Sequence, residues 1–398
     1  MTAIITNKSR FFNIENFLSA IKNADRMVYA FIGKSDIWNE SDTTPDPIKS
    51  INRERIDSED ILAMKRVLYK DLVVVASYNQ WDETHDTVYD MYDDSIDMFG
   101  KTYTVVTGDD YRVYKCISNG DGAKSTIQPT YTSVDSMSSI GSDGYQWKYM
   151  YSMKSATTSD TAWDWVTDPS PSVVNVNGLP AFMPVINVTS RTDNDTQWDV
   201  RKAAIDGAIH RIEVTGTVAG SETVTLYKDS TTEWDVGFNA SSNSAGDGIV
   251  ISNPGKGINT IYKISVGSTE YEMPSEVIRP IYSPPGGHGS DPIKELMATY
   301  VYINASIDQD VQVPNNQYRK VGLIYDPFRQ TRTDTTDNKL THIDESNELV
   351  LGEKLGKSMA IATDYLEYSG HITYVDNRLS FGTKQVGQTV SLMVILSF

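Results

Sequence analysis

The chain has 398 residues, of which 39% are hydrophobic, and this is enough apolar material for a folded core of more than one domain. Its formal net charge of −18 argues against non-specific binding to nucleic acid or to anionic lipid, because both present negative phosphates. The single cysteine, Cys116, excludes an intrachain disulfide framework.

Helical patterns occur at three places along the chain. Phe12–Lys22 carries apolar residues at helical spacing, and Asn13 is suited to cap its first turn. Ser58–Tyr69 has the same spacing on one face. A short third helix is expected at Asp291-Pro292, because proline is favoured at the first helical position.

Most of the remaining chain is typical of β-strands, with β-branched and aromatic residues in short runs. Strands are expected at Leu72–Ser77, Thr102–Thr107, Tyr111–Ser118, Tyr145–Met153, Tyr300–Ala305, Lys320–Tyr325 and Thr389–Phe398. The last run is apolar at nearly every position, so we expect both of its faces to be covered. The predicted fold class is therefore mainly β with a few helices (α+β), with a layered β-α-β sandwich as its body.

The middle of the chain has a different composition. Residues 185–275 are rich in Thr, Val, Ser, Gly and Asn, and Ile212–Val218 and Glu222–Tyr227 alternate cleanly. Proline-marked segments flank this region at Asp168–Pro171 and Pro280–Gly289. We interpret residues 171–279 as an inserted, protruding all-β domain, and residues 1–170 and 280–398 as the two parts of the body.

Residue patterns that carry chemistry are scarce. The five histidines, His85, His210, His288, His342 and His371, form no metal-ligand spacing, so we interpret each as a surface or hydrogen-bonded structural residue. Cys116 lies in a predicted strand and is interpreted as buried filler. The sequence predicts no catalytic, cofactor-binding or metal-binding residue, and hence a protein that is not an enzyme.

Four other strings have alternative interpretations. Gly352–Ser358 is one residue short of a phosphate-binding P-loop, so we expect no nucleotide there. The acidic clusters at Asp90–Asp97 and Asp193–Asp199 are interpreted as solvated faces. A calcium site in these clusters stays open, as does a glycosidase carboxylate pair drawn from Asp82, Asp86, Asp90, Asp93 and Asp94. Gly286–Gly289 is interpreted as a tight loop that leads into the third helix, with an anion-binding nest as the alternative.

Five strings, taken together, resemble a known protein family. They are Phe31–Trp38 followed by Pro45–Pro47, then Trp81 with Tyr89–Tyr92, Arg112–Cys116, Gly141–Tyr149 and Gly370–Arg378. In this order they resemble the baseplate wedge protein called gene product eight of T-even-like, contractile-tailed bacteriophages, and Pro284–Leu296 resembles longer members of that family. The positions that carry the likeness are Gly33, Trp38, Trp81, Tyr89, Tyr92, Gly144, Tyr145, Trp147, Gly286, Gly287, His288, Gly289, Asn377 and Arg378.

The resemblance implies a structural protein of the phage tail baseplate wedge that contributes to baseplate assembly and to transmission of the contraction trigger. It also implies a homodimer that contacts other baseplate wedge proteins and binds no cofactor. The expected location is the tail baseplate of the virion, after assembly in the host cytoplasm. The sequence shows no signal-peptide pattern and no apolar run long enough for a membrane helix, so we expect no membrane partner and no nucleic-acid partner.

A second function fits the central region. Trp198 and Trp234 in the predicted β-rich domain are residues that can stack on sugars. The alternative is therefore a tail-associated carbohydrate-binding or depolymerising protein.

Overall fold

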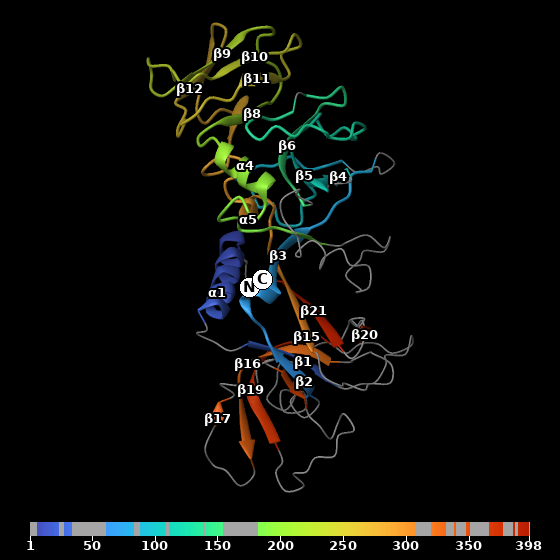
Figure 1. Cartoon of the computed structure of the whole chain (residues 1–398). Helices are drawn as coiled ribbons and strands as arrows, with labels where there is room; N and C mark the ends of the chain where they lie inside the picture. Colours follow the sequence, from blue (N-terminus) through green and yellow to red (C-terminus); the bar gives the residue numbers. More distant parts are fainter. Residues whose placement is uncertain are drawn as a thin grey trace. The chain divides into compact units, whose positions relative to one another are not determined.

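The computed structural model describes residues 6–23, 28–33, 61–82, 88–108, 111–138, 140–153, 182–307, 320–331, 338–339, 348–350, 366–376, 385–386 and 389–397. In these ranges the chain is mainly β, with several antiparallel sheets and the helices α1 (Asn7–Lys22), α4 (Asp195–Ala203) and α5 (Pro292–Glu295) (Figure 1). The predicted mainly β fold with a few helices is confirmed. None of the helices in the described ranges combines the length and the apolar character that a membrane span requires.

The chain divides into two compact units. Unit 1 comprises Met1–Val75, Asp164–Phe182 and Thr299–Phe398, and unit 2 comprises Ala76–Trp163 and Met183–Ala298. Residues 76–163, which we assigned to the body, thus belong to one unit with residues 183–298. That the β-rich region folds as an inserted domain, with boundaries at 171 and 279, stays a prediction.

Unit 1 contains α1 and two sheets built from both ends of the chain. The first sheet has the order β17 (Asn338–Lys339), β16 (Lys320–Thr331), β1 (Val28–Gly33), β2 (Ile61–Arg66), β18 (Glu348–Val350), and β19 (Leu366–Asp376) also pairs with β16. The second has the order β20 (Gln385–Val386), β21 (Thr389–Ser397), β15 (Tyr300–Ile307), β3 (Leu72–Ser77), β7 (Phe182–Pro184). The strands expected at 72–77, 300–305, 320–325 and 389–398 are confirmed, and the cover on both faces of β21 stays a prediction.

The N-terminal helix begins earlier than its pattern indicated. Thr6 caps it, because its hydroxyl oxygen accepts a hydrogen bond of 3.3 Å from the main-chain N–H of Ser9, and the expected cap Asn13 lies inside the helix. Phe11, Ile14, Phe17 and Ile21 are its buried face. Their spacing of three and four residues is that of an amphipathic helix, so the prediction of a helix is confirmed and its start is corrected.

The second predicted helix, at 58–69, is wrong. Residues 61–66 form β2, which pairs with β1 on one side and β18 on the other, with Met64 opposite Phe31 and Leu349. A 3₁₀ turn, Tyr69–Asp71, follows it. Pairing along both edges of the strand supplies main-chain hydrogen bonds that outweigh the modest helical propensity of these residues.

Unit 2 contains three sheets. The first has the order β4 (Thr104–Thr107), β5 (Arg112–Asn119), β6 (Tyr145–Ser152), and a two-stranded ribbon pairs β14 (Ile278–Tyr282) with β8 (Ile209–Val214). The third has the order β11 (Ile249–Asn253), β10 (Asn239–Ser242), β9 (Thr223–Tyr227), β12 (Lys263–Val266), β13 (Thr269–Glu272). The strands expected at 102–107, 111–118, 145–153, 212–218 and 222–227 are confirmed with shifts of a few residues at their ends.

The β-rich region has an apolar core of its own. Val224 and Leu226 of β9 are buried, and the residues between and beside them are not. This alternation is the period-two pattern of a strand with one face in the core. Ile209, Ile212, Ile264, Val266 and Ile278 belong to the same buried cluster, which therefore joins the ribbon to the five-stranded sheet.

Candidate functional site

The aromatic residues of unit 2 that carry the family resemblance meet in one buried cluster, which we call the aromatic core. Tyr89, Tyr92, Tyr145 and Trp147 are buried in it, and Trp81 packs against it. The rings of Tyr145 and Trp147 stack with centroids 5.4 Å apart, and Tyr89 meets Trp147 edge to face at 5.5 Å. Strings separated by more than fifty residues in the sequence thus form a single packing unit.

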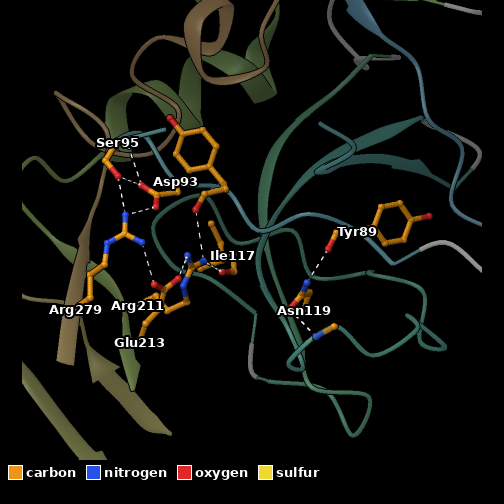
Figure 2. Close-up of polar contacts among 10 residues, drawn as sticks. Tyr89, Asp93, Ser95, Ile117, Asn119, Arg211, Glu213 and Arg279 are labelled. Carbon is orange, nitrogen blue, oxygen red and sulfur yellow. Dashed lines mark hydrogen bonds and ion pairs between the residues drawn. The ribbon is translucent and has the colours of Figure 1, made fainter. Parts of the chain in front are cut away.

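Hydrogen bonds fix several polar atoms of this core. The Tyr145 hydroxyl donates to the main-chain oxygen of Ala123 at 2.7 Å and accepts from the N–H of Tyr89 at 3.2 Å. The side-chain amide of Asn119 donates to the main-chain oxygen of Tyr89 at 2.9 Å (Figure 2). The Trp81 indole donates to the Ser125 hydroxyl at 3.1 Å. The aromatic core is therefore held in one arrangement by directional bonds as well as by packing.

Gly144 is required by close packing between two loops. Its φ is +82°, and a Cβ atom there would lie 2.5 Å from the Cα of Gly120. No side chain fits at this distance, so the family-like glycine lets β6 begin against the loop that follows β5. Of the remaining family-like positions, Gly33 ends β1 and pairs with Lys320, while Trp38, Asn377 and Arg378 lie outside the described residues.

The Gly286–Gly289 string forms a tight loop that leads into α5, as predicted. Gly287 and Gly289 have φ near +90°, and Cβ atoms there would lie 2.4 Å from the main-chain oxygen of Ile205 and 2.3 Å from a methyl group of Val200. Asp291 caps α5, and Pro292 occupies its first turn. The loop consequently packs directly against the segment that follows α4.

This loop does bind a carboxylate, which is one of the chain's own. The side chain of Glu295 accepts hydrogen bonds from the N–H of Gly289 at 2.8 and 3.0 Å and from the N–H of Asp291 at 3.2 Å. Glu295 is only 2% exposed, and it pairs with the ammonium group of Lys115, which is fully buried. The anion that this loop binds in the structure is therefore the Glu295 carboxylate of the chain itself.

Tyrosine rings enclose that ion pair. The Lys115 ammonium lies 3.9 Å from the centroid of the Tyr92 ring, and the Tyr103 hydroxyl donates to the main-chain oxygen of Glu295 at 2.9 Å. Burial lowers the pKa of Lys115, and the charge of Glu295 opposes this shift. Burial, reinforced by the charge of Glu295, raises the pKa of both tyrosines. We call Lys115, Glu295, Tyr92 and Tyr103, together with His210 and His288, the buried polar centre.

His210 and His288 do not fit the interpretation given to the histidines. Both are buried, and their rings lie edge to face with centroids 4.8 Å apart. No hydrogen bond is found at any of their four nitrogens among the described residues. Neither side chain lies at the surface, so that part of the interpretation is wrong for these two histidines. The side chains of His85, His342 and His371 lie outside the described residues.

A second lysine lies beside Lys115. Lys148 of β6 is opposite Lys115 of β5 in the sheet, and both side chains are buried. The two ammonium groups have separate partners, since Lys148 donates to the main-chain oxygens of Val134 at 2.7 Å and Ser136 at 3.3 Å. Burial and the nearby charge of Lys115 lower the pKa of Lys148 to about 8.

A network of charged residues joins the ribbon β8–β14 to the segment before β4. Figure 2 shows the guanidinium group of Arg279 between Asp93 and Glu213, at 2.6 and 3.0 Å. Arg211 pairs with Glu213 at 2.8 Å and donates to the main-chain oxygen of Ile117. We call these residues the arginine network. Burial raises the pKa of Asp93, but hydrogen bonds from Ser95 and Arg279 outweigh it, so the pKa lies below its usual value.

The other candidates have structural roles where the structure describes them. Cys116 is buried, as predicted, and burial raises the pKa of its thiol. Asp193 accepts hydrogen bonds from Thr189 and Ser190, next to α4, which the sequence analysis missed. The described residues contain no group of three or more His, Cys, Asp or Glu side chains placed to hold a metal ion. Gly352–Ser358 lies outside the described part of the chain.

Asp90, of the acidic cluster at 90–97, accepts a hydrogen bond of 2.8 Å from the N–H of Thr102 and pairs with Lys101 at 3.6 Å. With Asp93 in the arginine network, two carboxylates of this cluster have partners within the chain. Asp86 lies outside the described residues.

Comparison of the chain with models of known protein families finds no match, and comparison with curated proteins finds none either. The geometry of unit 2 therefore has to be interpreted by itself. In the described residues of the buried polar centre, the two charged groups neutralise each other. The imidazoles of His210 and His288 lie beside this pair and contact each other.

Proposed function

We propose that this chain is a structural component of the baseplate wedge of a contractile-tailed phage. In this proposal it pairs as a dimer, contacts neighbouring wedge proteins and contributes to the transmission of the contraction trigger. It has no catalytic turnover of its own. It assembles in the host cytoplasm and ends in the tail baseplate of the virion.

One observation carries the proposal. Short strings that match a family by chance would fall on scattered positions of the fold. Here Trp81, Tyr89, Tyr92, Tyr145 and Trp147 meet in the aromatic core, and Gly144 permits the close loop contact at its edge. This convergence supports the resemblance, because the matching residues belong to one folded core and are not scattered over the structure.

The charge arrangement is a second support. Lys115 and Glu295 are paired away from solvent, and Asp93 is bound by Arg279 and Ser95. An enzyme needs titratable groups that reach a substrate. A scaffold instead benefits from buried polar groups that select one packing arrangement, which suits this distribution.

The surface of unit 2 offers side chains suited to protein contacts. Ile96, Ile127, Tyr131 and Ile140 are large apolar residues that are each at least 40% exposed. A permanent dimer should bury upward of ~2,000 Å² in total. The net charge of −18 opposes indiscriminate self-association, so that specific apolar contacts decide the partner.

The alternative, a carbohydrate-binding or depolymerising protein, gains no support from its two tryptophans. The ammonium group of Lys202 lies 4.5 Å from the ring centroid of Trp198. Trp234 packs against the core of the β-rich region, and its indole donates to the main-chain oxygen of Thr260 at 2.9 Å. Both rings are thus engaged by the chain itself.

Association tests the proposal. Light scattering on the purified chain should give the mass of a dimer, and co-expression with the neighbouring tail genes should yield a stable complex. Trp198→Ala and Trp234→Ala serve as controls and should leave both results unchanged. A strict monomer that joins no tail protein and cleaves host polysaccharide, with cleavage lost in the tryptophan variants, would favour the alternative.

A further inference from the structure

The two histidines of the buried polar centre come from different elements and meet in the interior of unit 2. His210 lies on β8 and is 3% exposed, and His288 lies in the Gly286–Gly289 loop and is 6% exposed. Their ring centroids are 4.8 Å apart, and both rings also contact Tyr92. This histidine pair joins the loop before α5 to the ribbon β8–β14.

Positively charged side chains lie near both imidazoles of the pair. Lys115 of β5 and Lys148 of β6 act on His288, and Arg211 of β8 and Lys115 act on His210. Each imidazole would also repel the other if both carried a charge, since the two rings are in direct contact. A proton on either ring would therefore meet like charge from two strands.

The carboxylates near the pair are already engaged. Glu295 of α5 lies 3.9 Å from Nδ1 of His288, but it accepts two main-chain N–H groups and pairs with Lys115. Asp93 faces His210 and is held by Arg279 and Ser95. The main chain of Tyr92 also favours a proton on His210, but weakly beside the effect of burial. The described residues around the pair thus accommodate neutral imidazoles and supply no unengaged counter-charge for an imidazolium ion.

We propose that the histidine pair is an acid-sensitive latch: neutral imidazoles hold the Gly286–Gly289 loop against residues 200–206, and their protonation releases it. Two hydrogen bonds close the loop: the N–H of Gly286 donates to the side chain of Asp206 at 2.9 Å, and the N–H of Gly287 donates to the main-chain oxygen of Pro284 at 2.8 Å. Release would break this contact and expose Ile205 and Val200, against which Gly287 and Gly289 now pack. The inference does not depend on the proposed function.

The sign of the pH dependence follows from burial. Burial, together with Arg211 and Lys115, lowers the pKa of His210 to about 3, and burial lowers that of His288 well below its usual value. The open state therefore takes up protons first, because its imidazoles titrate near the ordinary value of about 6.5. The closed loop is fully stable above that value and loses stability as pH falls from it toward the folded pKa.

Linkage sets the size of the effect. Between pH 6 and pH 5, an imidazole with an open-state pKa of ~6.5 that stays neutral when closed shifts the opening equilibrium about eightfold, and two such groups shift it ~60-fold. Carboxylates have ordinary pKa values near 4, so they contribute little in this interval. The interval therefore isolates the histidines.

Hydrogen exchange of the loop amides is the first test. The protection factors of residues 286–291, corrected for the intrinsic pH dependence of exchange, should fall ~60-fold from pH 6 to pH 5. A His210→Phe/His288→Phe variant keeps two rings but cannot be protonated, and its protection should stay constant. His371→Gln, on β19 of unit 1, is the matched control and should behave as the wild type. Constant protection in the wild type, or an acid-induced fall in the double variant, would overturn the latch.

Imidazole titration by NMR tests the same idea without any variant. Two imidazoles should remain neutral at pH 5 in the folded chain. Assignment of these two to His210 and His288 through single His→Gln variants completes the test. If both latch histidines titrate near 6.5 while the chain stays folded and the loop protected, the proposal is wrong.

Discussion

The ion pair between Lys115 and Glu295 gives the sharpest stability prediction. Lys115 is fully buried and Glu295 is 2% exposed, so removal of either partner leaves a charge in the interior of unit 2. Breaking a buried pair in this way costs ~3–5 kcal/mol of unfolding free energy. Lys115→Met and Glu295→Gln should each fall in this range.

The double variant distinguishes a paired charge from simple loss of packing. Lys115→Met/Glu295→Gln contains neither charge, and the amide oxygen that replaces the carboxylate can still accept from the main chain. Its loss of unfolding free energy should therefore be smaller than the sum of the single losses by about 2 kcal/mol or more. Urea unfolding at neutral pH, followed by tryptophan fluorescence and near-ultraviolet circular dichroism, measures all three.

A surface pair supplies the control. Arg191 and Asp199 are 3.0 Å apart with side chains 64% and 41% exposed, so Arg191→Met should cost less than about 1 kcal/mol. If Lys115→Met costs no more than this control, or if the two buried substitutions add without coupling, the reasoning about the buried polar centre is refuted.

Three further outcomes follow from the same unit. Gly287→Ala should lower the unfolding free energy, measured with urea, by upward of ~2 kcal/mol, because its Cβ would collide with a main-chain oxygen. Gly216 has a similar φ and open space around it, so Gly216→Ala should cost only about 1 kcal/mol. Equal losses in the two variants would contradict this. The thiol of Cys116 should not react with a chromogenic disulfide in the folded chain and should react fully in concentrated urea, and reaction of the folded chain would contradict its burial. Arg279→Met should lower the unfolding free energy by ~1–3 kcal/mol at neutral pH. This loss should shrink as pH falls below about 4, because Asp93 is then protonated. A loss independent of pH would show that the guanidinium acts by packing alone.

Strand patterns were the most reliable guide to the fold. Leu72–Ser77 and Thr223–Tyr227 are strands because β-branched residues and period-two alternation favour that structure independently of context. Residues 61–66 were mispredicted as helix, because Leu, Ala, Met and Lys favour a helix by themselves. They form a strand only through pairing with neighbours distant in sequence.

The missed helix α4 had a readable signal. Asn194 caps it by accepting from the N–H of Gln197 at 2.9 Å, which is the spacing of an N-terminal cap, and Arg201 and Lys202 end it. From the sequence, this stretch is interpreted as a cluster of carboxylates, with Trp198 as a residue that can stack on sugars. The cap pattern could have predicted the helix.

The buried polar centre could be predicted only in part. The glycines around His288 identified a constrained loop, because no other residue adopts those backbone angles easily. Lys115 and Glu295 are 180 residues apart, and a lysine within an apolar strand gives no sign of the carboxylate it will meet. The same holds for His210, whose partner ring belongs to a loop 78 residues further on.

Under the proposed function, the genome that encodes this chain also encodes a contractile tail, and electron cryomicroscopy of such tails tests the central claim most directly. The account predicts density for two copies of the chain in each wedge of the baseplate, with apolar surface of unit 2 against a neighbouring protein. Absence of the chain from the baseplate, or its presence only as a peripheral, sugar-cleaving appendage, would contradict the proposal that it is a structural wedge component.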